Sequence, residues 1–228
     1  IKFNINTKVD HLLKNDNRSE YKIFNSVKNS MKIMNVEKID TLYLHQNELN
    51  ILSDKKILRA LEKLKSEGLI DKIGSSIYSY EECQYSIDCD IYDVVQVPMS
   101  IMDTYIHSLV VKKGTLKNTE LVARSVFLQG TLFNRADIKN KIKHSKNMLE
   151  YLKKIDLLSY TYNVPLVNIS CAFLLSLPGV SNLIVGTRSI ENLSDIRNAA
   201  LFTLPEGLFD QIRMLSEEYK EWGNPRNW

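Results

Sequence analysis

The segment IDTLYLHQNELNILSDKKILRALEKLKSEGLIDKIGSS, residues 39–76, decides the fold. It opens with a short apolar run, 39–44, which predicts a buried strand. Ser53 and Asp54 follow as candidate helix caps, and the apolar residues after them recur at helical spacing. A second short apolar run, 70–76, then predicts another strand. Strand, helix and strand in this order form the unit from which parallel sheets are built.

The same alternation continues on both sides of this segment. Further strands are expected at residues 2–7, 94–97, 120–124 and 180–185, and further helices at about 23–34, after Ser79, and at 103–113, 148–162, 167–176, 190–200 and 208–222. Such short and apolar strands favour a parallel sheet that is covered by helices. The sequence therefore predicts an α/β fold with six strands.

Two α/β folds compete for this pattern. A doubly wound sheet is expected to show GxGxxG after a strand, but the sequence contains no such motif, and its nearest signal, Ile73-Gly-Ser-Ser76, lacks the second and third glycines. We therefore expect a (β/α)8 TIM barrel of which about six βα units are present. Because Ile1 already lies in an apolar alternation, residues 1–228 are expected to form one barrel domain that lacks the first two units.

Composition limits the classes of partner and the cellular compartment that are expected for this protein. The 30 basic and 27 acidic residues are spread along the chain and leave a net charge of +3, which predicts no nucleic-acid partner. No apolar run approaches the roughly 20 residues that span a bilayer, so no membrane segment is expected. Three cysteines without CxxC or Cys/His ligand spacing predict no metal site and a reducing compartment. We expect a cytoplasmic protein that is a monomer or a weak homo-oligomer.

Position in the strands selects candidates for catalysis, because catalytic groups of parallel barrels lie at the carboxyl ends of strands. Lys8 ends the first expected strand, and His45 follows the second. Each also fits a plain structural interpretation, a solvated lysine and a histidine satisfied at a strand end. The residues alone leave these alternatives open.

Polar side chains also follow later strands. They are Ser75 and Ser76, Gln96, and Ser125, and together they would line one mouth of the barrel with hydrogen-bonding groups that suit a cofactor. After the last strand, residues 184–190 lead directly into a helix, whose N-terminus is a favourable place for a phosphate. Ser189 fits a simple helix cap equally well.

Six segments share the pattern of one enzyme family. They are Asn6-Thr-Lys8, Asp40-Thr-Leu-Tyr-Leu-His45, the stretch from Glu67 to Ser76, Val95-Gln96, the stretch from Ala123 to Gly130, and Ile184-Val-Gly-Thr-Arg-Ser-Ile-Glu-Asn-Leu193. In order and spacing they resemble segments of the aldo-keto reductase superfamily, and the stretch from Arg124 to Gly130 looks like a variant found in bacterial members. The resemblance covers essentially the whole chain and implies the barrel fold.

The resemblance implies a catalytic quartet of Asp, Tyr, Lys and His. Lys8 would be the lysine that lowers the pKa of the proton-donating tyrosine, and His45 would orient the substrate carbonyl and stabilise charge on its oxygen. The Asp and Tyr of the quartet are expected upstream of Ile1.

The resemblance also implies a nicotinamide cofactor and the residues that hold it. Ser76 and Gln96 would bind the carboxamide, Arg124 would stand where many members stack a tyrosine on the nicotinamide, Ser125, Phe127 and Gln129 would face the pyrophosphate, and Gly186, Thr187, Arg188, Ser189, Asn192 and Asp195 would hold the adenosine end. Arg188 is the candidate partner of a 2′-phosphate, which favours NADPH over NADH. A metal is not expected.

The implied function is an NAD(P)H-dependent oxidoreductase that reduces a small-molecule aldehyde or ketone, with a sugar-derived carbonyl as the candidate substrate. An alternative is a non-catalytic nucleotide-binding barrel that acts as a binding or regulatory module. Specificity for the substrate is expected from the loop at residues 130–145 and from the tail at 222–228.

Overall fold

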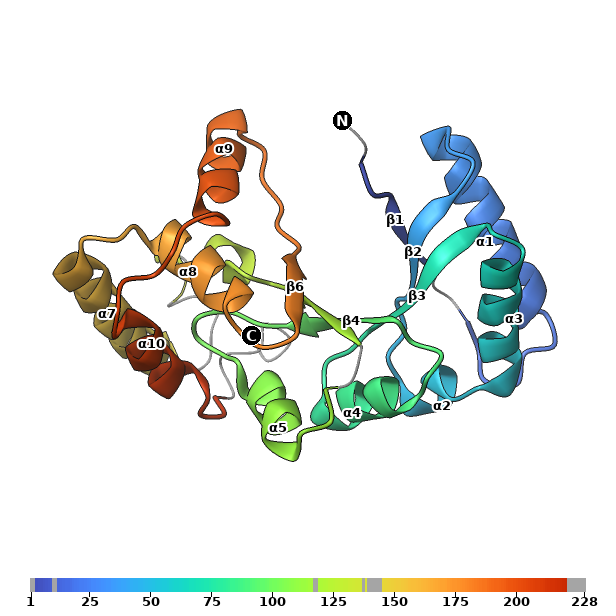
Figure 1. Ribbon diagram of the computed structural model, residues 1–228, viewed down its shortest axis with the longest axis horizontal. Coiled ribbons are helices and arrows are strands. Elements are labelled where there is room, and N and C mark those ends of the chain that lie inside the picture. The colour runs from blue at the N-terminus through green and yellow to red at the C-terminus, as the bar shows by residue number, and fades with distance from the viewer. Residues whose placement is uncertain (1–2, 10–11, 117–118, 137, 139–144, 221–228) are drawn as a thin grey trace. The chain divides into compact units, whose positions relative to one another are not determined.

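The computed structural model describes residues 3–9, 12–116, 119–136, 138 and 145–220 (Figure 1). Its strands are β1 (Asn6–Val9), β2 (Ile39–Leu44), β3 (Ile70–Ser76), β4 (Val94–Pro98), β5 (Glu120–Arg124) and β6 (Val180–Leu183). Its helices are α1 (Ser19–Met34), α2 (Leu49–Leu52), α3 (Lys55–Ser66), α4 (Tyr80–Asp88), α5 (Tyr105–Lys113), the 3-10 turn η1 (Leu128–Gly130), α7 (Ser145–Tyr162), α8 (Leu166–Leu175), α9 (Ile190–Ala199) and α10 (Leu208–Ser216).

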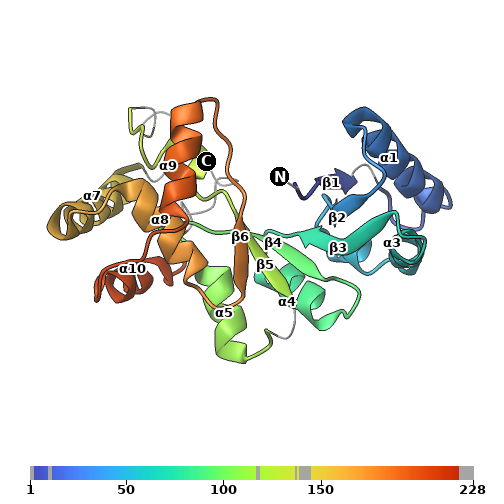
Figure 2. The ribbon, with the colours of Figure 1, turned by 45° about the horizontal axis from the view of Figure 1, so that its top comes forward.

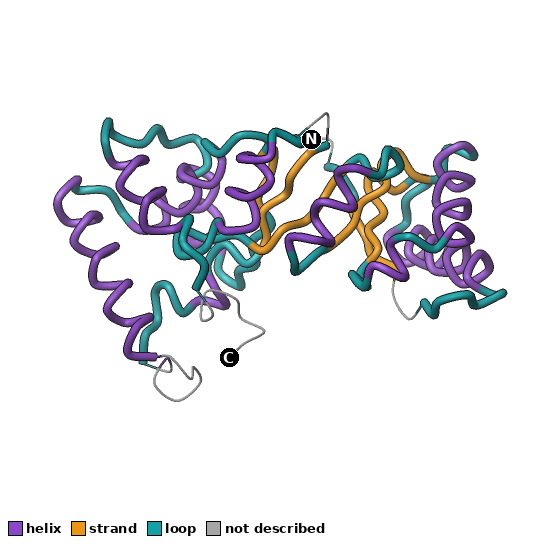
Figure 3. Tube along the Cα trace, turned by 90° about the horizontal axis from the view of Figure 1, so that it is seen from below, coloured by secondary structure: helices purple, strands orange, loops and turns teal. Residues whose placement is uncertain are grey.

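The strand order confirms the predicted fold class. The strands form one parallel six-stranded sheet in the order β1-β2-β3-β4-β5-β6, and their alternation with helices can be followed along the trace in Figure 3. In a doubly wound sheet the order reverses at a switch point. Strands that simply follow the chain order are typical of a (β/α) barrel.

Some expected bounds were wrong by a few residues. Strand β1 begins at Asn6 rather than at residue 2, because the Asp40 carboxylate accepts the Ile5 N–H at 2.5 Å and pairing with β2 begins only at Asn6, opposite Thr41. Lys8 therefore lies inside the strand instead of ending it. Helix α10 ends at Ser216, and the sequence pattern did not predict the short α2 and η1.

Two expected features lie partly or wholly outside the described residues. The loop at 130–145 is described only in part, and the tail at 222–228 is not described. The chain divides into two compact units, residues 1–97 with 113–121, and residues 98–112 with 122–228. The expectation of one barrel domain stays a prediction.

In the first unit, α1 and α3 lie side by side on one face of strands β1 to β3 (Figures 1 and 2). Two contacts identify the side chains that face the helices: the Thr7 hydroxyl meets Ser30 of α1 at 3.4 Å, and Ser75 donates to Ser86 of α4 at 2.8 Å. Because side chains alternate along a strand, Lys8, Tyr43 and Ser76 belong to the opposite face.

Asp54 determines where α3 begins. One carboxylate oxygen accepts the backbone N–H groups of Lys56 and Ile57 at 2.8 and 3.4 Å, and the other accepts that of Asn15 at 2.9 Å. This helix cap also ties α3 to the loop before α1. Burial alone would raise the pKa of Asp54, but the three backbone donors outweigh it and lower the pKa below its ordinary value of 3.8.

We expect Asp54→Ala to lower the free energy of unfolding by about 1–2 kcal/mol at neutral pH, as loss of a helix cap does. Because the pKa of Asp54 is lowered in the folded protein, the stability that its carboxylate provides is fully present above pH 3.8. This stability is lost as the pH falls through the lower pKa of the folded state. Urea unfolding at neutral and acid pH measures both. Ser53→Ala is the control, because the neighbouring Ser53 hydroxyl donates to the Leu49 carbonyl of α2 and is not the cap of α3. Equal losses in the two variants would contradict the prediction.

The second unit has its own apolar core. Helix α8 is central to it: Phe173 is fully buried and its ring lies 5.3 Å from that of Phe209 on α10. The Ile184 N–H donates to the Ala123 carbonyl at 2.7 Å and joins the end of β6 to β5. Within the described residues, no single helix is long and apolar enough to cross a membrane, and α7 and α8 meet that test only as a pair bent by 96°.

Candidate functional site

Three loops meet at the carboxyl ends of β1, β2 and β3, and side chains directly after His45 tie them together. Gln46 makes two hydrogen bonds to Leu12 in the loop after β1: its Oε1 accepts the Leu12 N–H at 2.5 Å, and its Nε2 donates to the Leu12 carbonyl at 2.8 Å. Asn47 donates to Glu82 of α4 at 2.6 Å. The segment after His45 is thereby held on both sides.

Glu82 also makes hydrogen bonds in the loop after β3. Its carboxylate accepts the backbone N–H groups of Tyr78 and Ser79 at 2.7 and 3.0 Å, while the Ser79 hydroxyl accepts the Glu82 N–H at 3.2 Å. This is a capping box, which fixes the start of α4. Sequence patterns point to such a box through Ser79 and Glu82, but the partner Asn47 is 35 residues away and leaves no local signal.

We expect Gln46→Ala to lower the free energy of unfolding by about 1–3 kcal/mol, because it leaves the backbone N–H and carbonyl of Leu12, a buried residue, without their partner. Thermal or urea unfolding measures the change. Asn50→Ala, at an exposed position of α2, is the control and should be nearly neutral. A loss in Gln46→Ala no larger than in the control would sink this account of the loop.

Lys8 and His45, the two candidate catalytic residues, lie on neighbouring strands. Lys8 pairs in register with Tyr43, and the His45 N–H donates to the Val9 carbonyl at 2.9 Å directly after β2. Both side chains are exposed. By alternation Lys8 and His45 belong to the face of the strands away from α1 and α3.

Ser76 and Gln96, the candidate carboxamide ligands, are also neighbours. They are register partners on β3 and β4, and the next residue, Ile77, donates its N–H to the Gln96 carbonyl at 3.0 Å. Both side chains are buried. The Gln96 Oε1 has no hydrogen-bond partner among the described residues. A buried acceptor left in this state costs free energy, so it fits a ligand that donates an N–H there.

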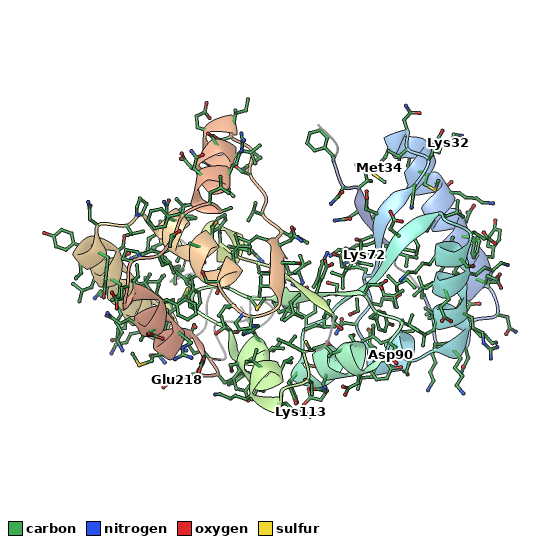
Figure 4. The ribbon with its side chains drawn as sticks, in the orientation of Figure 1. Lys32, Met34, Lys72, Asp90, Lys113 and Glu218 are labelled. Atoms are coloured by element: carbon green, nitrogen blue, oxygen red, sulfur yellow. The ribbon has the colours of Figure 1, made fainter. Side chains whose placement is uncertain are left out.

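An ion pair lies on the same face of the strands as Lys8 and Ser76. Lys72, labelled beside β3 in Figure 4, forms an ion pair with Glu120 of β5. It lies two residues before Gly74 and therefore on the same face. In the part of the chain that the structure describes, no cluster of three or more His, Cys, Asp or Glu side chains could hold a metal ion.

A pocket of about 440 Å³ lies within the second unit. It is lined by Phe127, Gly130, Phe133, Val167, Gly186, Thr187, Asn192, Asp195 and Ile196. Five of these residues are ones that the sequence indicated for a cofactor: Phe127, Gly186, Thr187, Asn192 and Asp195. Phe133 and Val167 had no such signal, and they join the pocket only because the loop after η1 and α8 pack there. The Phe127 and Phe133 rings lie 5.3 Å apart.

The segment after β5 has an unusual backbone. Ser125, Leu128 and Gln129 adopt left-handed conformations with φ of 62°, 48° and 55°, which non-glycine residues rarely adopt and which cluster at functional sites. Ser125 accepts the Leu128 N–H through its carbonyl at 2.9 Å, so the chain turns tightly here. Arg124 precedes this turn, and its carbonyl accepts the Met99 N–H at 2.9 Å.

Ser189 caps α9, which is one of the two roles, helix cap or phosphate ligand, that the sequence left open for it. Its hydroxyl accepts the Asn192 N–H at 3.2 Å and donates to Glu191 at 2.6 Å, and this hydrogen bond lowers the pKa of the Glu191 carboxyl. The Thr187 hydroxyl accepts the Ser189 N–H at 3.2 Å. Arg188 is exposed between them, beside the pocket that Thr187 and Asn192 line.

Comparison with known proteins adds a family and a fold. A family model described as the aldo/keto reductase family matches residues 2–217. Two solved structures of the aldo-keto reductase AKR11C1 from Bacillus halodurans match with TM-scores of 0.73: the apo form at 21% identity, covering 96% of this chain and 73% of that one, and the holo form at 20%, covering 96% and 74%. No curated protein matches the chain. At this identity the structures show the fold, and the family match extends through both units.

Proposed function

The chain belongs to the aldo-keto reductase family, which indicates an oxidoreductase, and on that premise we propose that it uses NADPH to reduce an aldehyde or ketone to an alcohol. A small carbonyl compound derived from a sugar is the proposed substrate. The observation that carries the proposal is the pocket of about 440 Å³, because it gathers five residues that the sequence resemblance had assigned to the cofactor, four to its adenosine end and Phe127 to its pyrophosphate.

Two buried residues of the first unit suit a nicotinamide carboxamide. The Gln96 Oε1 is an acceptor without a partner among the described residues, and Ser76 lies beside it in register. A nicotinamide carboxamide offers the N–H donors that such an acceptor needs. When bound, the cofactor supplies a hydride to the carbonyl carbon, and the protein supplies binding, orientation and charge.

Lys8 and His45 are the residues of this chain that we propose for catalysis. The ammonium group of Lys8 would lower the pKa of the proton-donating tyrosine of the family's quartet. His45 would donate a hydrogen bond to the substrate oxygen and stabilise the charge that develops there. Their positions on adjacent strands, at the end where the tied loops lie, support this assignment.

Arg188 carries the proposed preference for NADPH. It is exposed next to the capped N-terminus of α9, where free backbone N–H groups favour an anion. A guanidinium group binds a phosphate through paired hydrogen bonds, so Arg188 would favour the 2′-phosphate of NADPH over the hydroxyl of NADH.

Titration with NADPH and NADH, followed by an assay of NADPH oxidation with aldehydes and ketones, tests the proposal. We expect stoichiometric binding, tighter for NADPH, and oxidation that requires the carbonyl compound. Binding without oxidation of NADPH by any carbonyl compound would favour the alternative, a nucleotide-binding module. Absence of binding would overturn the cofactor assignment.

A further inference from the structure

A pocket of about 370 Å³ lies within the second unit, where α5, α10 and the turn between α8 and β6 meet. We call it the α5–α10 pocket. Its volume is within the range of about 300–1,000 Å³ that is typical of small-molecule sites. It shares no lining residue with the pocket around Phe127 and Gly186, and none of its residues was indicated for catalysis or for the cofactor. The proposed function therefore leaves this pocket without a ligand.

Apolar side chains form part of the wall of the α5–α10 pocket. They come from Val111 of α5, Leu177 of the turn before β6 and Phe209 of α10. The Phe209 ring is held in place, because it lies 5.3 Å from the ring of the fully buried Phe173 on α8. Such a wall suits the hydrocarbon body of a ligand.

A buried histidine adds a hydrogen-bond acceptor to this wall. The His107 side chain is 4% exposed, and its Nε2 lies 2.9 Å from the Pro178 carbonyl oxygen, to which it must donate. Burial lowers the pKa of His107, although the bond to Pro178 and the charge of Glu217 act in the opposite direction. The ring is therefore neutral at neutral pH, and Nδ1 keeps a lone pair. Within the described residues, the bond to Pro178 is the only hydrogen bond of the ring, so Nδ1 suits a ligand that donates an O–H or N–H.

Two cationic side chains, Lys112 of α5 and Arg213 of α10, also line the pocket. The Glu217 carboxylate lies between them, 3.8 Å from the Lys112 Nζ and 4.0 Å from the Arg213 Nε, and both distances exceed a hydrogen bond. Asp210, which does not line the pocket, lies 3.3 Å from the Arg213 Nη2. A guanidinium group has five N–H donors, so these carboxylates leave donors on Arg213 for a further anion.

We propose that the α5–α10 pocket is a second binding site, which takes a small carboxylic acid with an apolar body and a hydroxyl group. The carboxylate binds to Arg213 and Lys112, the body packs on Leu177 and Phe209, and the hydroxyl donates to the Nδ1 of His107. The site requires no cofactor, and it is therefore independent of the proposed function.

The probe for this site is 6-hydroxy-2-naphthoate, which joins a carboxylate and a hydroxyl through an apolar ring system. Calorimetric titration, with and without saturating NADPH, measures its affinity. We expect one molecule to bind per chain under both conditions. Two analogues separate the contacts: 2-naphthoate lacks the hydroxyl and 2-naphthol lacks the carboxylate. Each should bind about tenfold more weakly, because each leaves a polar group of the pocket without its partner.

Variants assign each contact to a residue. In Arg213→Met the preference for 6-hydroxy-2-naphthoate over 2-naphthol should fall toward equality. Arg197→Met is the matched control, because Arg197 is an exposed arginine of α9 in the same unit, and it should keep the full preference. In His107→Phe the preference for 6-hydroxy-2-naphthoate over 2-naphthoate should disappear. Each variant is judged by a ratio of two affinities, so a general loss of stability does not imitate the result.

The outcomes are distinguishable. Absence of binding, equal affinities for the three compounds, or an unchanged preference in Arg213→Met would each overturn the inference. Displacement of the probe by NADPH would show that it occupies the cofactor site and would also overturn the inference. Binding of the probe by a protein that does not bind NADPH would overturn the proposed function and support the second site.

Discussion

Lys8→Met is expected to lower kcat for carbonyl reduction by about 10²- to 10⁴-fold, the usual worth of a proton transfer assisted by a positioned group. Lys8 lies inside β1 in register with Tyr43 of β2, so its backbone is held by strand pairing. Removal of its charge would leave the donor tyrosine with the pKa of an ordinary phenol, too high for efficient proton donation at neutral pH.

Steady-state kinetics over a range of pH, with a cofactor titration of each variant, measures this effect. Affinity for NADPH should stay unchanged in Lys8→Met, since the proposed role of the lysine is to act on the proton donor. Lys14→Met is the control, because Lys14 is an exposed lysine in the loop after the same strand. Turnover in Lys8→Met equal to that of the control would remove Lys8 from the proposed mechanism.

His45→Ala is expected to lower kcat by about 10²- to 10³-fold, the cost of losing one hydrogen-bond donor to a developing oxyanion. Contacts other than the His45 side chain hold the backbone here: its N–H bonds to the Val9 carbonyl, and Gln46 and Asn47 hold the following segment to Leu12 and Glu82. The variant should therefore fold like the wild type.

His45→Gln provides the rescue, because an amide N–H can still donate to the substrate oxygen, and we expect it to recover part of the lost kcat. Glu48→Ala, exposed three residues further along, is the control. Single-turnover measurements at saturating NADPH isolate the chemical step. A histidine that only supports the structure would give equal losses in the alanine and glutamine variants, together with a lower free energy of unfolding.

Much of the candidate site could be predicted from the sequence because its members follow strands. Phe127 after β5, and Gly186, Thr187 and Asn192 after β6, were indicated by the family resemblance of the segments that follow these strands, and the structure gathers them around one pocket. Loops at the carboxyl ends of parallel strands share one edge of the sheet. A correct strand assignment therefore brings together residues that are far apart in the chain.

The remaining features depend on pairs of residues that no local pattern connects. Gln46 bonds to Leu12 and Asn47 to Glu82 across 34 and 35 residues, and Tyr43 passes over Gly74 on the next strand. Phe133 reaches the pocket from a loop with no periodicity. Even the start of β1 was decided by a side chain, Asp40, on another strand.

The sequence by itself determined the alternation of strands and helices, the class of fold and the strand ends where polar residues collect, because apolar periodicity and helix caps are local properties of a chain. The tertiary structure alone decided which strands are neighbours in which register and which loops are tied around His45. These properties arise from contacts between distant segments, whose partners are set only when the strands pair and the side chains pack.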